Sequence, residues 1–161
     1  MENWCDNTVR FTGEPTIVTT INKLFSKMEK DQEKGCFQLP RFITAENRLM
    51  TDLSVQPDYI YYRTRCEPNL QALQQIADHF NAGFVNRYAE PGTYLWGQAT
   101  YANAQAENID LDRDDLKQFS YDSELACYHY NGKTYDDNFD VLTDMLDDKI
   151  QRTRASYQLG R

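Results

Sequence analysis

The sequence predicts an α+β protein in which strands and helices follow the order β-α-β-β-α-β, with further strands and a helix after them. Three patterns support this prediction. Short segments alternate apolar and polar residues, as half-buried strands do. Longer segments repeat apolar residues with the period of an amphipathic helix. Glycine, proline and asparagine separate these segments at positions expected of turns.

The first part of the chain predicts three strands and one helix. Residues 7–12 alternate, with Val9 and Phe11 on the apolar side, and end at Gly13. A helix follows from Pro15, because proline suits a first helical turn, and Gly35 ends it. Its apolar stripe comprises Ile17, Ile21, Leu24, Phe25 and Met28. We expect a short second strand at residues 36–39, a long connection at residues 40–57 and a third strand at residues 58–65.

A second helix and a hairpin come next. Pro68 starts the helix, and residues 81–83 close it. Its inward positions are Leu70, Leu73, Ala77 and Phe80. Residues 84–88 and 94–101 predict two strands joined by the turn Glu90-Pro91-Gly92. This order of elements is the split βαβ pattern of ferredoxin-like folds.

The remaining residues predict an extension of this core. Residues 102–120 are polar and acidic, with a short helix near residues 114–119. Residues 125–130 and 133–135 predict a hairpin, because Asn131-Gly132 accommodates the positive φ of a tight turn. A last helix at residues 137–155 has an apolar face of Phe139, Leu142, Met145, Leu146 and Ile150. We therefore expect a single domain at residues 1–161, with a ferredoxin-like core at residues 1–101 and an acidic C-terminal extension at residues 102–161 packed on it.

Charge is unevenly distributed along the chain. The net charge is −8; residues 1–91 carry 10 basic and 12 acidic residues, and residues 92–161 carry 7 and 13. Such a field repels phosphate backbones, so we expect nucleic-acid binding to be disfavoured and a protein partner, including a basic one, to be favoured. A specific version of this hypothesis is an acidic decoy for a basic host protein. Without a membrane span or a leader pattern, we expect a cytoplasmic protein.

No catalytic, cofactor or metal site is predicted. The four cysteines lack the close pairs that zinc or iron–sulfur sites need. Asp110, Asp112 and Asp114 have calcium-loop spacing, but Asp115 and Tyr121 stand where that loop needs Gly and Glu. Cys127 and His129 are a conceivable dyad on one sheet face, without an identifiable oxyanion site. We therefore expect no enzyme, and keep as the alternative a small-molecule or catalytic pocket between the sheet and the last helix.

Several short motifs resemble one protein family. Four segments are similar to YubB-type ferredoxin-like proteins, a family carried largely by plasmids and phages of bacteria. They are Asn3-Trp4-Cys5-Asp6-Asn7, Glu67-Pro68-Asn69, residues 87–92 (Arg-Tyr-Ala-Glu-Pro-Gly) and Trp96-Gly97. The resemblance covers about residues 2–100. One departure is Cys66, where family members often have Trp. The resemblance implies the fold, a mobile genetic element and a bacterial host, but no activity.

The candidate binding surface combines rigid aromatic residues with arginines, as interface hot spots do. Its predicted members are Trp4, Asn7, Arg63, Arg65, Arg87, Tyr88, Glu90 and Trp96. We expect a non-enzymatic protein-interaction module of a mobile element. A third hypothesis is single-stranded nucleic-acid binding, since Tyr59, Tyr61, Arg63 and Arg65 alternate along one strand, as in the stacking platforms of RNA-binding sheets. The sequence does not predict an oligomeric state.

Overall fold

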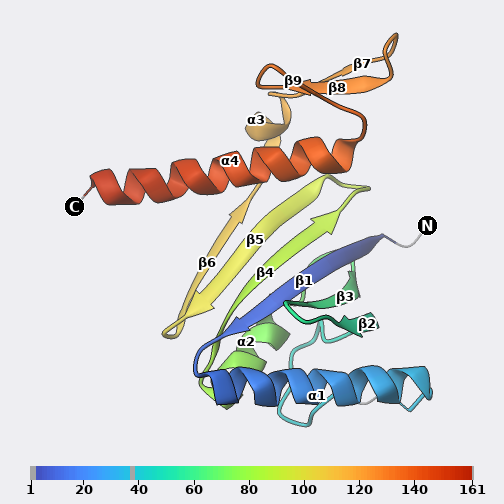
Figure 1. The fold of residues 1–161 in the computed structure, drawn as a ribbon, viewed down its shortest axis with the longest axis vertical. Coiled ribbons are helices and arrows are strands. Elements are labelled where there is room, and N and C mark those ends of the chain that lie inside the picture. The colour runs from blue at the N-terminus through green and yellow to red at the C-terminus, as the bar shows by residue number, and fades with distance from the viewer. Residues whose placement is uncertain (1–2, 37–38, 161) are drawn as a thin grey trace.

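The computed structural model describes residues 3–36 and 39–160 and confirms an α+β, ferredoxin-like fold. Its elements, in chain order, are β1 Trp4–Thr12, α1 Pro15–Glu33, β2 Thr51–Val55, β3 Ile60–Arg65, α2 Leu70–Phe80, β4 Gly83–Glu90, β5 Leu95–Ala102, β6 Gln105–Asp110, α3 Arg113–Leu116, β7 Ser120–Asp122, β8 Cys127–Tyr130, β9 Lys133–Tyr135 and α4 Asn138–Leu159. Figure 1 shows their arrangement.

The main sheet has the strand order β2-β3-β1-β4-β5-β6, with every neighbouring pair antiparallel. The first four strands of this order reproduce the ferredoxin-like sheet, and the β5–β6 hairpin widens it beyond β4. The order brings β1 between β3 and β4, so that Thr8 lies opposite both Tyr61 and Arg87. Residues distant in sequence therefore share one row across the sheet.

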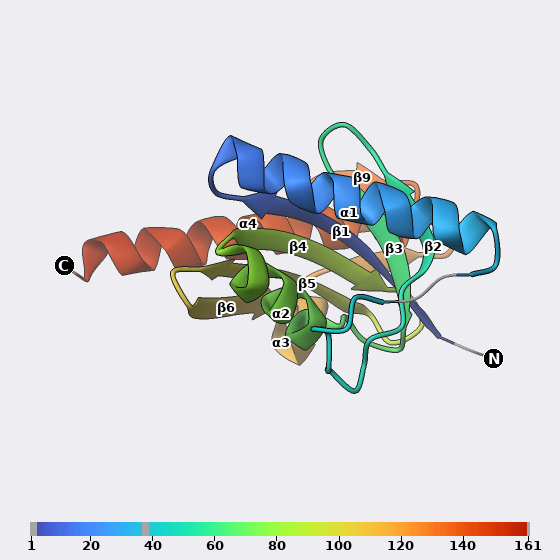
Figure 2. The same ribbon diagram turned by 90° about the horizontal axis from the view of Figure 1, so that it is seen from below.

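Helices cover the two faces of the sheet unequally. α1 and α2 pack on one face, where Phe25 and Leu73 join Val9 and Phe84 in the larger hydrophobic core (Figure 2). α4 lies against the opposite face but only over its β5–β6 side, where Trp96 contributes to a second core. The β1–β3 side of that opposite face is left without a covering helix.

Local sequence signals explain where the helices begin and end. Pro15 occupies the first turn of α1, and Asn81 ends α2 in the left-handed conformation, with φ of 52°. The side chain of Asp137 accepts a hydrogen bond of 2.9 Å from the backbone N–H of Asp140 at the start of α4. Apolar spacing places Leu142 and Ile150 in the second core as predicted, whereas Phe139 is 51% exposed.

Three strands differ from prediction: β2 was predicted at the wrong position, and β6 and β7 were not predicted. The second strand is Thr51–Val55, inside the predicted connection; Cys36 and Leu39 lie in no strand, and residues 37–38 of the predicted strand lie outside the described residues. No strand was predicted at residues 105–110, which form β6 because their backbone pairs with β5 along its whole length. β1 also begins three residues earlier than predicted, at Trp4.

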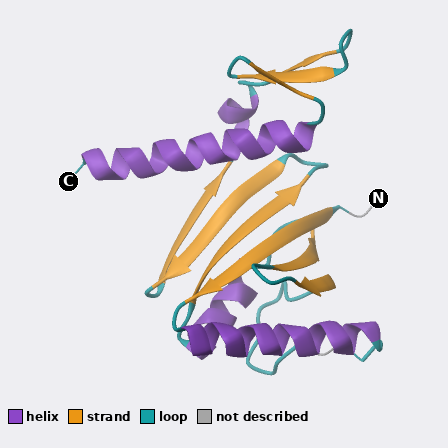
Figure 3. Ribbon diagram, viewed as in Figure 1, coloured by secondary structure: helices purple, strands orange, loops and turns teal. Residues whose placement is uncertain are grey.

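The three short strands β7, β8 and β9 form a separate small sheet beyond α4 (Figure 3). α4 contacts β8 and β9 as well as β5 and β6, so it separates the small sheet from the main one. Asn131 and Gly132 form the predicted turn, with φ of 48° and 75°. None of the helices in the described part of the chain is long and apolar enough to cross a membrane.

Candidate functional site

The candidate site is the uncovered part of the sheet face that α4 leaves exposed, which we call the open face. Strand alternation determines its members, because every second side chain of β1 and β3 points away from the α1–α2 core. The open face consists of the side chains of Trp4, Asp6, Thr8, Arg10, Tyr61, Arg63, Arg65 and Arg87. The described part of the chain therefore gathers four arginines and two aromatic residues on one surface.

Two guanidinium groups lie over the ring of Trp4. The Cζ atom of Arg63 is 5.4 Å from the centre of the Trp4 ring, and that of Arg65 is 5.9 Å away. The pairing of Trp4 with Arg65 across β1 and β3 produces this arrangement. A cation within about 6 Å of an indole face is attracted by the electrons of the ring. The contacts hold Trp4, which is half-buried, in a defined orientation at the surface.

Ion pairs and hydrogen bonds occupy other polar groups of this face. Arg63 binds the carboxylate of Asp52, and the hydroxyl of Tyr61 donates a hydrogen bond of 2.6 Å to Asp6. Burial of the Tyr61 hydroxyl, together with this hydrogen bond, raises its pKa. Arg87 binds Asp147 of α4. The site is thus preorganised, with most of its side chains held by neighbours before any partner binds.

Four of the eight predicted surface residues are buried, with 0–3% of each exposed: Asn7, Tyr88, Glu90 and Trp96. Asn7 and Tyr88 point into the α1–α2 core, and Trp96 lies under α4. The carboxylate of Glu90 accepts hydrogen bonds from the backbone N–H groups of Gly92 and Thr93, at 2.8 and 2.7 Å, and so holds the β4–β5 turn. These residues support the structure, and Trp96 also lines a hollow beside α4.

The other four predicted residues, Trp4, Arg63, Arg65 and Arg87, lie together on the open face. Sequence reasoning missed Arg10, although the alternation of β1 already placed it on the same side as Thr8. It also missed Asp52 and Asp147, for which the sequence carries no signal, because their relevance depends on contacts with Arg63 and Arg87.

The catalytic alternative finds no support in the small sheet. The Sγ atom of Cys127 lies 3.6 Å from Nε2 of His129, and the same nitrogen lies 3.9 Å from a carboxylate oxygen of Asp122. In a catalytic triad the nucleophile and the orienting carboxylate contact opposite ring nitrogens. Here Nδ1 faces the hydroxyl of Thr134 at 3.2 Å. Cys127 is also 6% exposed, and α4 separates this pair from the open face.

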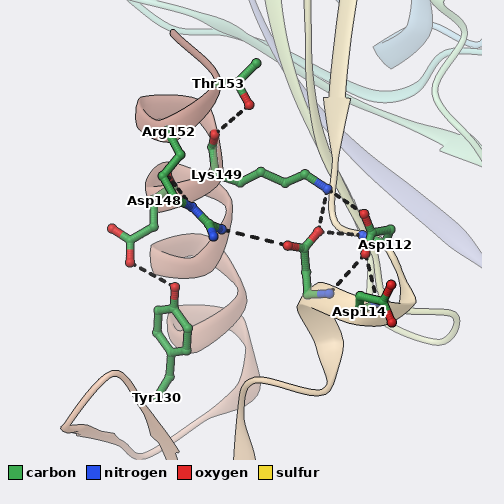
Figure 4. A network of polar contacts seen from close by, with 8 residues as sticks. Asp112, Asp114, Tyr130, Asp148, Lys149, Arg152 and Thr153 are labelled. Carbon is green, nitrogen blue, oxygen red and sulfur yellow. Dashed lines mark hydrogen bonds and ion pairs between the residues drawn. The ribbon is translucent and has the colours of Figure 1, made fainter. Parts of the chain in front are cut away.

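Some carboxylates of the acidic extension are paired with cations of the same segment. Lys149 of α4 binds Asp112, at 2.9 Å, and Asp115 of α3, and Arg152 reaches Asp115 at 3.8 Å (Figure 4). The hydrogen bond from Lys149, with two backbone N–H donors, lowers the pKa of Asp112 to about 2. These contacts fix α3 against α4. No group of three potential metal-ligating residues in the described ranges is placed to hold an ion.

The acidic decoy hypothesis depends on six aspartates of the extension, and these lie in different settings. They are Asp110, Asp114, Asp137, Asp140, Asp144 and Asp148. Asp144 accepts a hydrogen bond of 2.7 Å from Tyr135, and Asp148 accepts one of 2.9 Å from Tyr130. Asp110 lines a hollow beside the start of α2 instead. Asp110 lies at the end of β6 and Asp144 lies on α4 beside β9, so these two carboxylates have different neighbours.

Comparison with known proteins gives one match. Residues 46–131 match the model of a family described as a ferredoxin-like domain in Api92-like protein. This range extends from the residues before β2 to the turn after β8. Neither the curated proteins nor the solved structures contain a significant match.

Proposed function

The chain belongs to the family of ferredoxin-like domains in Api92-like proteins, and we propose that it is a non-enzymatic protein-interaction module that binds its partner through the open face. The observation that carries this proposal is the Trp4 ring with the guanidiniums of Arg63 and Arg65 both within 6 Å of its centre. Trp and Arg are the residue types most enriched at interface hot spots, where a rigid ring supplies contact area at a small entropic cost.

The ion pairs of the open face favour a protein over a nucleic acid. Single-stranded nucleic acid needs cationic side chains that follow its phosphates. Arg63 already binds the carboxylate of Asp52, and Arg87 binds that of Asp147. A phosphate would have to displace these carboxylates, within a chain whose net charge of −8 repels polyanions. A protein surface with only a few charged groups is repelled less, and it can contact Trp4 without displacing these carboxylates.

The chemistry of the open face changes the partner that we propose. The sequence suggested a basic partner because residues 92–161 are acidic, but many of those carboxylates have partners within the chain. The open face carries more arginines than aspartates. We therefore propose a partner that presents carboxylates and apolar side chains to this face. From the resemblance to YubB-type proteins, we also propose that the protein acts in the cytoplasm of a bacterial host of a plasmid or phage.

The proposal is tested by affinity capture from a bacterial lysate with three forms of the tagged protein. These are the wild type, the double variant Trp4→Ala/Arg65→Ala and a control variant, Arg154→Ala/Tyr157→Ala, which removes an exposed Arg and an exposed Tyr from the end of α4. We expect the wild type and the control to enrich the same proteins and the open-face variant to lose them. Capture is repeated after nuclease treatment and at two salt concentrations, with mass spectrometry as the readout.

Two results would count against the proposal. Equal enrichment by all three forms would show that the open face takes no part in binding. Enrichment that disappears after nuclease treatment and at high salt would identify a nucleic acid as the partner. A thermal melt of each variant shows whether it is folded before capture.

A further inference from the structure

A groove crosses the open face from the start of α4 to Arg10. It consists of two hollows, of about 350 and 370 Å³, which share Thr8 and Arg87 in their walls. The first hollow lies between the sheet and α4, and the second lies over β1 and β4. A pocket was expected between the sheet and the last helix on the basis of the sequence, but it contains neither Cys127 nor His129.

The end of the groove beside α4 is apolar. Trp96 and Ala89 form its floor, and Phe139 and Leu146 of α4 form its wall. The Phe139 ring packs edge-on against Trp96, with ring centres 5.4 Å apart, yet Phe139 is 51% exposed. Exposed aromatic surface beside a hollow gains free energy when another apolar side chain covers it. This end of the groove therefore suits one bulky apolar side chain.

The opposite end of the groove is cationic. Arg10 is exposed, and no residue in the described ranges forms an ion pair with it. By contrast, the Arg87 side chain between the two ends donates a hydrogen bond of 3.1 Å to Gln98 and binds Asp147. Arg10 is thus the guanidinium in the groove that is ready to receive a carboxylate. Charge complementarity at this end favours an acidic ligand.

The sheet register sets the spacing between the two ends. Asp6, Ala89 and Trp96 lie in one row across β1, β4 and β5, and Arg10 lies beside Val85 in another row. The rows are four residues apart along β1, which is about 13 Å at the rise of a β-strand. In an extended peptide, side chains at positions i and i+4 point to the same side and are separated by the same distance.

We infer that the groove binds an extended, acidic segment of the partner protein, with a bulky apolar side chain in the hollow beside Trp96 and Phe139 and a carboxylate four residues away on Arg10. This inference rests on the proposed function and specifies the chemistry of the partner. The groove recognises the peptide through side chains alone, since β1 is already paired on both sides and has no free edge.

The inference is tested by panning a displayed library of random 12-residue peptides on the intact protein. We expect enrichment of peptides with Leu, Phe, Trp, Ile or Met at one position and Asp or Glu four positions away. One enriched peptide is then synthesised with a fluorescein label for anisotropy titrations. Arg10→Gln should weaken its affinity about fivefold, as loss of a surface ion pair does, and Phe139→Ala about tenfold. The controls Arg154→Gln and Tyr157→Ala should leave the affinity unchanged.

The possible failures of the two proposals are distinguishable. Enriched peptides that lack this spacing, or that bind Arg10→Gln as tightly as the wild type, overturn the inference and leave the proposed function intact. Failure to enrich any peptide, combined with lysate capture that depends on Trp4 and Arg65, also overturns only the inference. Failure of both experiments overturns both. Binding of labelled oligothymidylate but of no peptide assigns the groove to nucleic acid.

Discussion

Asn86 donates a hydrogen bond of 3.0 Å from its side-chain amide to that of Asn7, 79 residues earlier in the chain and inside the apolar core. Asn7 in turn donates to the Thr64 hydroxyl, at 2.9 Å, and to the carbonyl of Cys5, at 3.0 Å. The network joins β3, β1 and β4 on the face of the sheet that α1 and α2 cover. Buried polar groups remain there because their hydrogen bonds offset the loss of hydration.

Asn7→Ala is expected to lower the free energy of unfolding by about 2–3 kcal/mol, because it leaves the Asn86 amide without its acceptor and opens a small cavity. Urea denaturation followed by tryptophan fluorescence measures the loss. The control Asn22→Ala changes a half-exposed residue of α1 and should alter stability by about 0.5 kcal/mol or less. Equal losses in the two variants would contradict a structural role for Asn7.

Replacement of the two tryptophans by alanine should affect different properties: stability for Trp96 and partner binding for Trp4. Trp96 is 2% exposed between the sheet and α4, so Trp96→Ala should cost about 3–5 kcal/mol of stability. Trp4 is half-buried at the surface, so Trp4→Ala should cost about 1 kcal/mol or less while abolishing partner capture. Chemical denaturation of both variants checks the contrast. A large loss of stability in Trp4→Ala would indicate that Trp4 serves the core.

Gly97 should not tolerate a side chain. Tyr88 lies opposite Gly97 across β4 and β5, and its ring passes over Gly97 so that the hydroxyl donates a hydrogen bond of 2.9 Å to Asn108. A Cβ atom at position 97 would overlap that ring. Gly97→Ala should therefore lower the free energy of unfolding by about 1–3 kcal/mol.

A double-mutant cycle identifies the Tyr88 ring as the cause. In a Tyr88→Ala background the Gly97→Ala substitution should cost much less, because the overlap has gone. Gly160→Ala, near the end of α4, meets no atom closer than 3.7 Å and should be close to neutral. Additive effects of Gly97→Ala and Tyr88→Ala would rule out the overlap as the cause.

The contact between Asp112 and Lys149 predicts a pH dependence of stability. The pKa of Asp112 in the folded protein, about 2, is below its ordinary value of 3.8. A lowered folded-state pKa gives a stabilisation that is fully present above about pH 4 and is lost as the pH falls through about 2. Asp112→Asn should therefore be less stable than the wild type at pH 5–7, and the difference should vanish near pH 2.

Urea denaturation at a series of pH values measures this difference. The matched control is Asp114→Asn, whose carboxylate pairs with Lys117 at a highly exposed position, 2.7 Å from its Nζ atom. Exposed pairs contribute little, so this control should follow the wild-type curve. A difference between Asp112→Asn and the wild type that does not change with pH would show that charge is not its origin.

Prediction from the sequence succeeded where local chemistry determines the secondary structure. The apolar period of residues 17–28 predicted α1, and the Asn131-Gly132 pair predicted the β8–β9 turn. It failed where pairing with a neighbouring strand determines the secondary structure. In β6 only Ile109 is buried, so residues 105–110 carry almost no alternation, and their strand conformation follows from hydrogen bonding to β5. The same holds for β2, in which only Leu53 is buried.

The residues of this chain by themselves determined the two helices and most strands of the ferredoxin-like core, the acidity of the extension, and the arginines and aromatic residues of the proposed binding surface. The tertiary structure alone decided which of those residues are exposed at the surface and which are buried. Asn7 and Glu90 are polar, yet both are buried, because hydrogen bonds to other groups of the chain replace those to water. Trp4 and Arg63 reach the surface together because β1 pairs with β3, a contact between residues too far apart in sequence for local preference to specify.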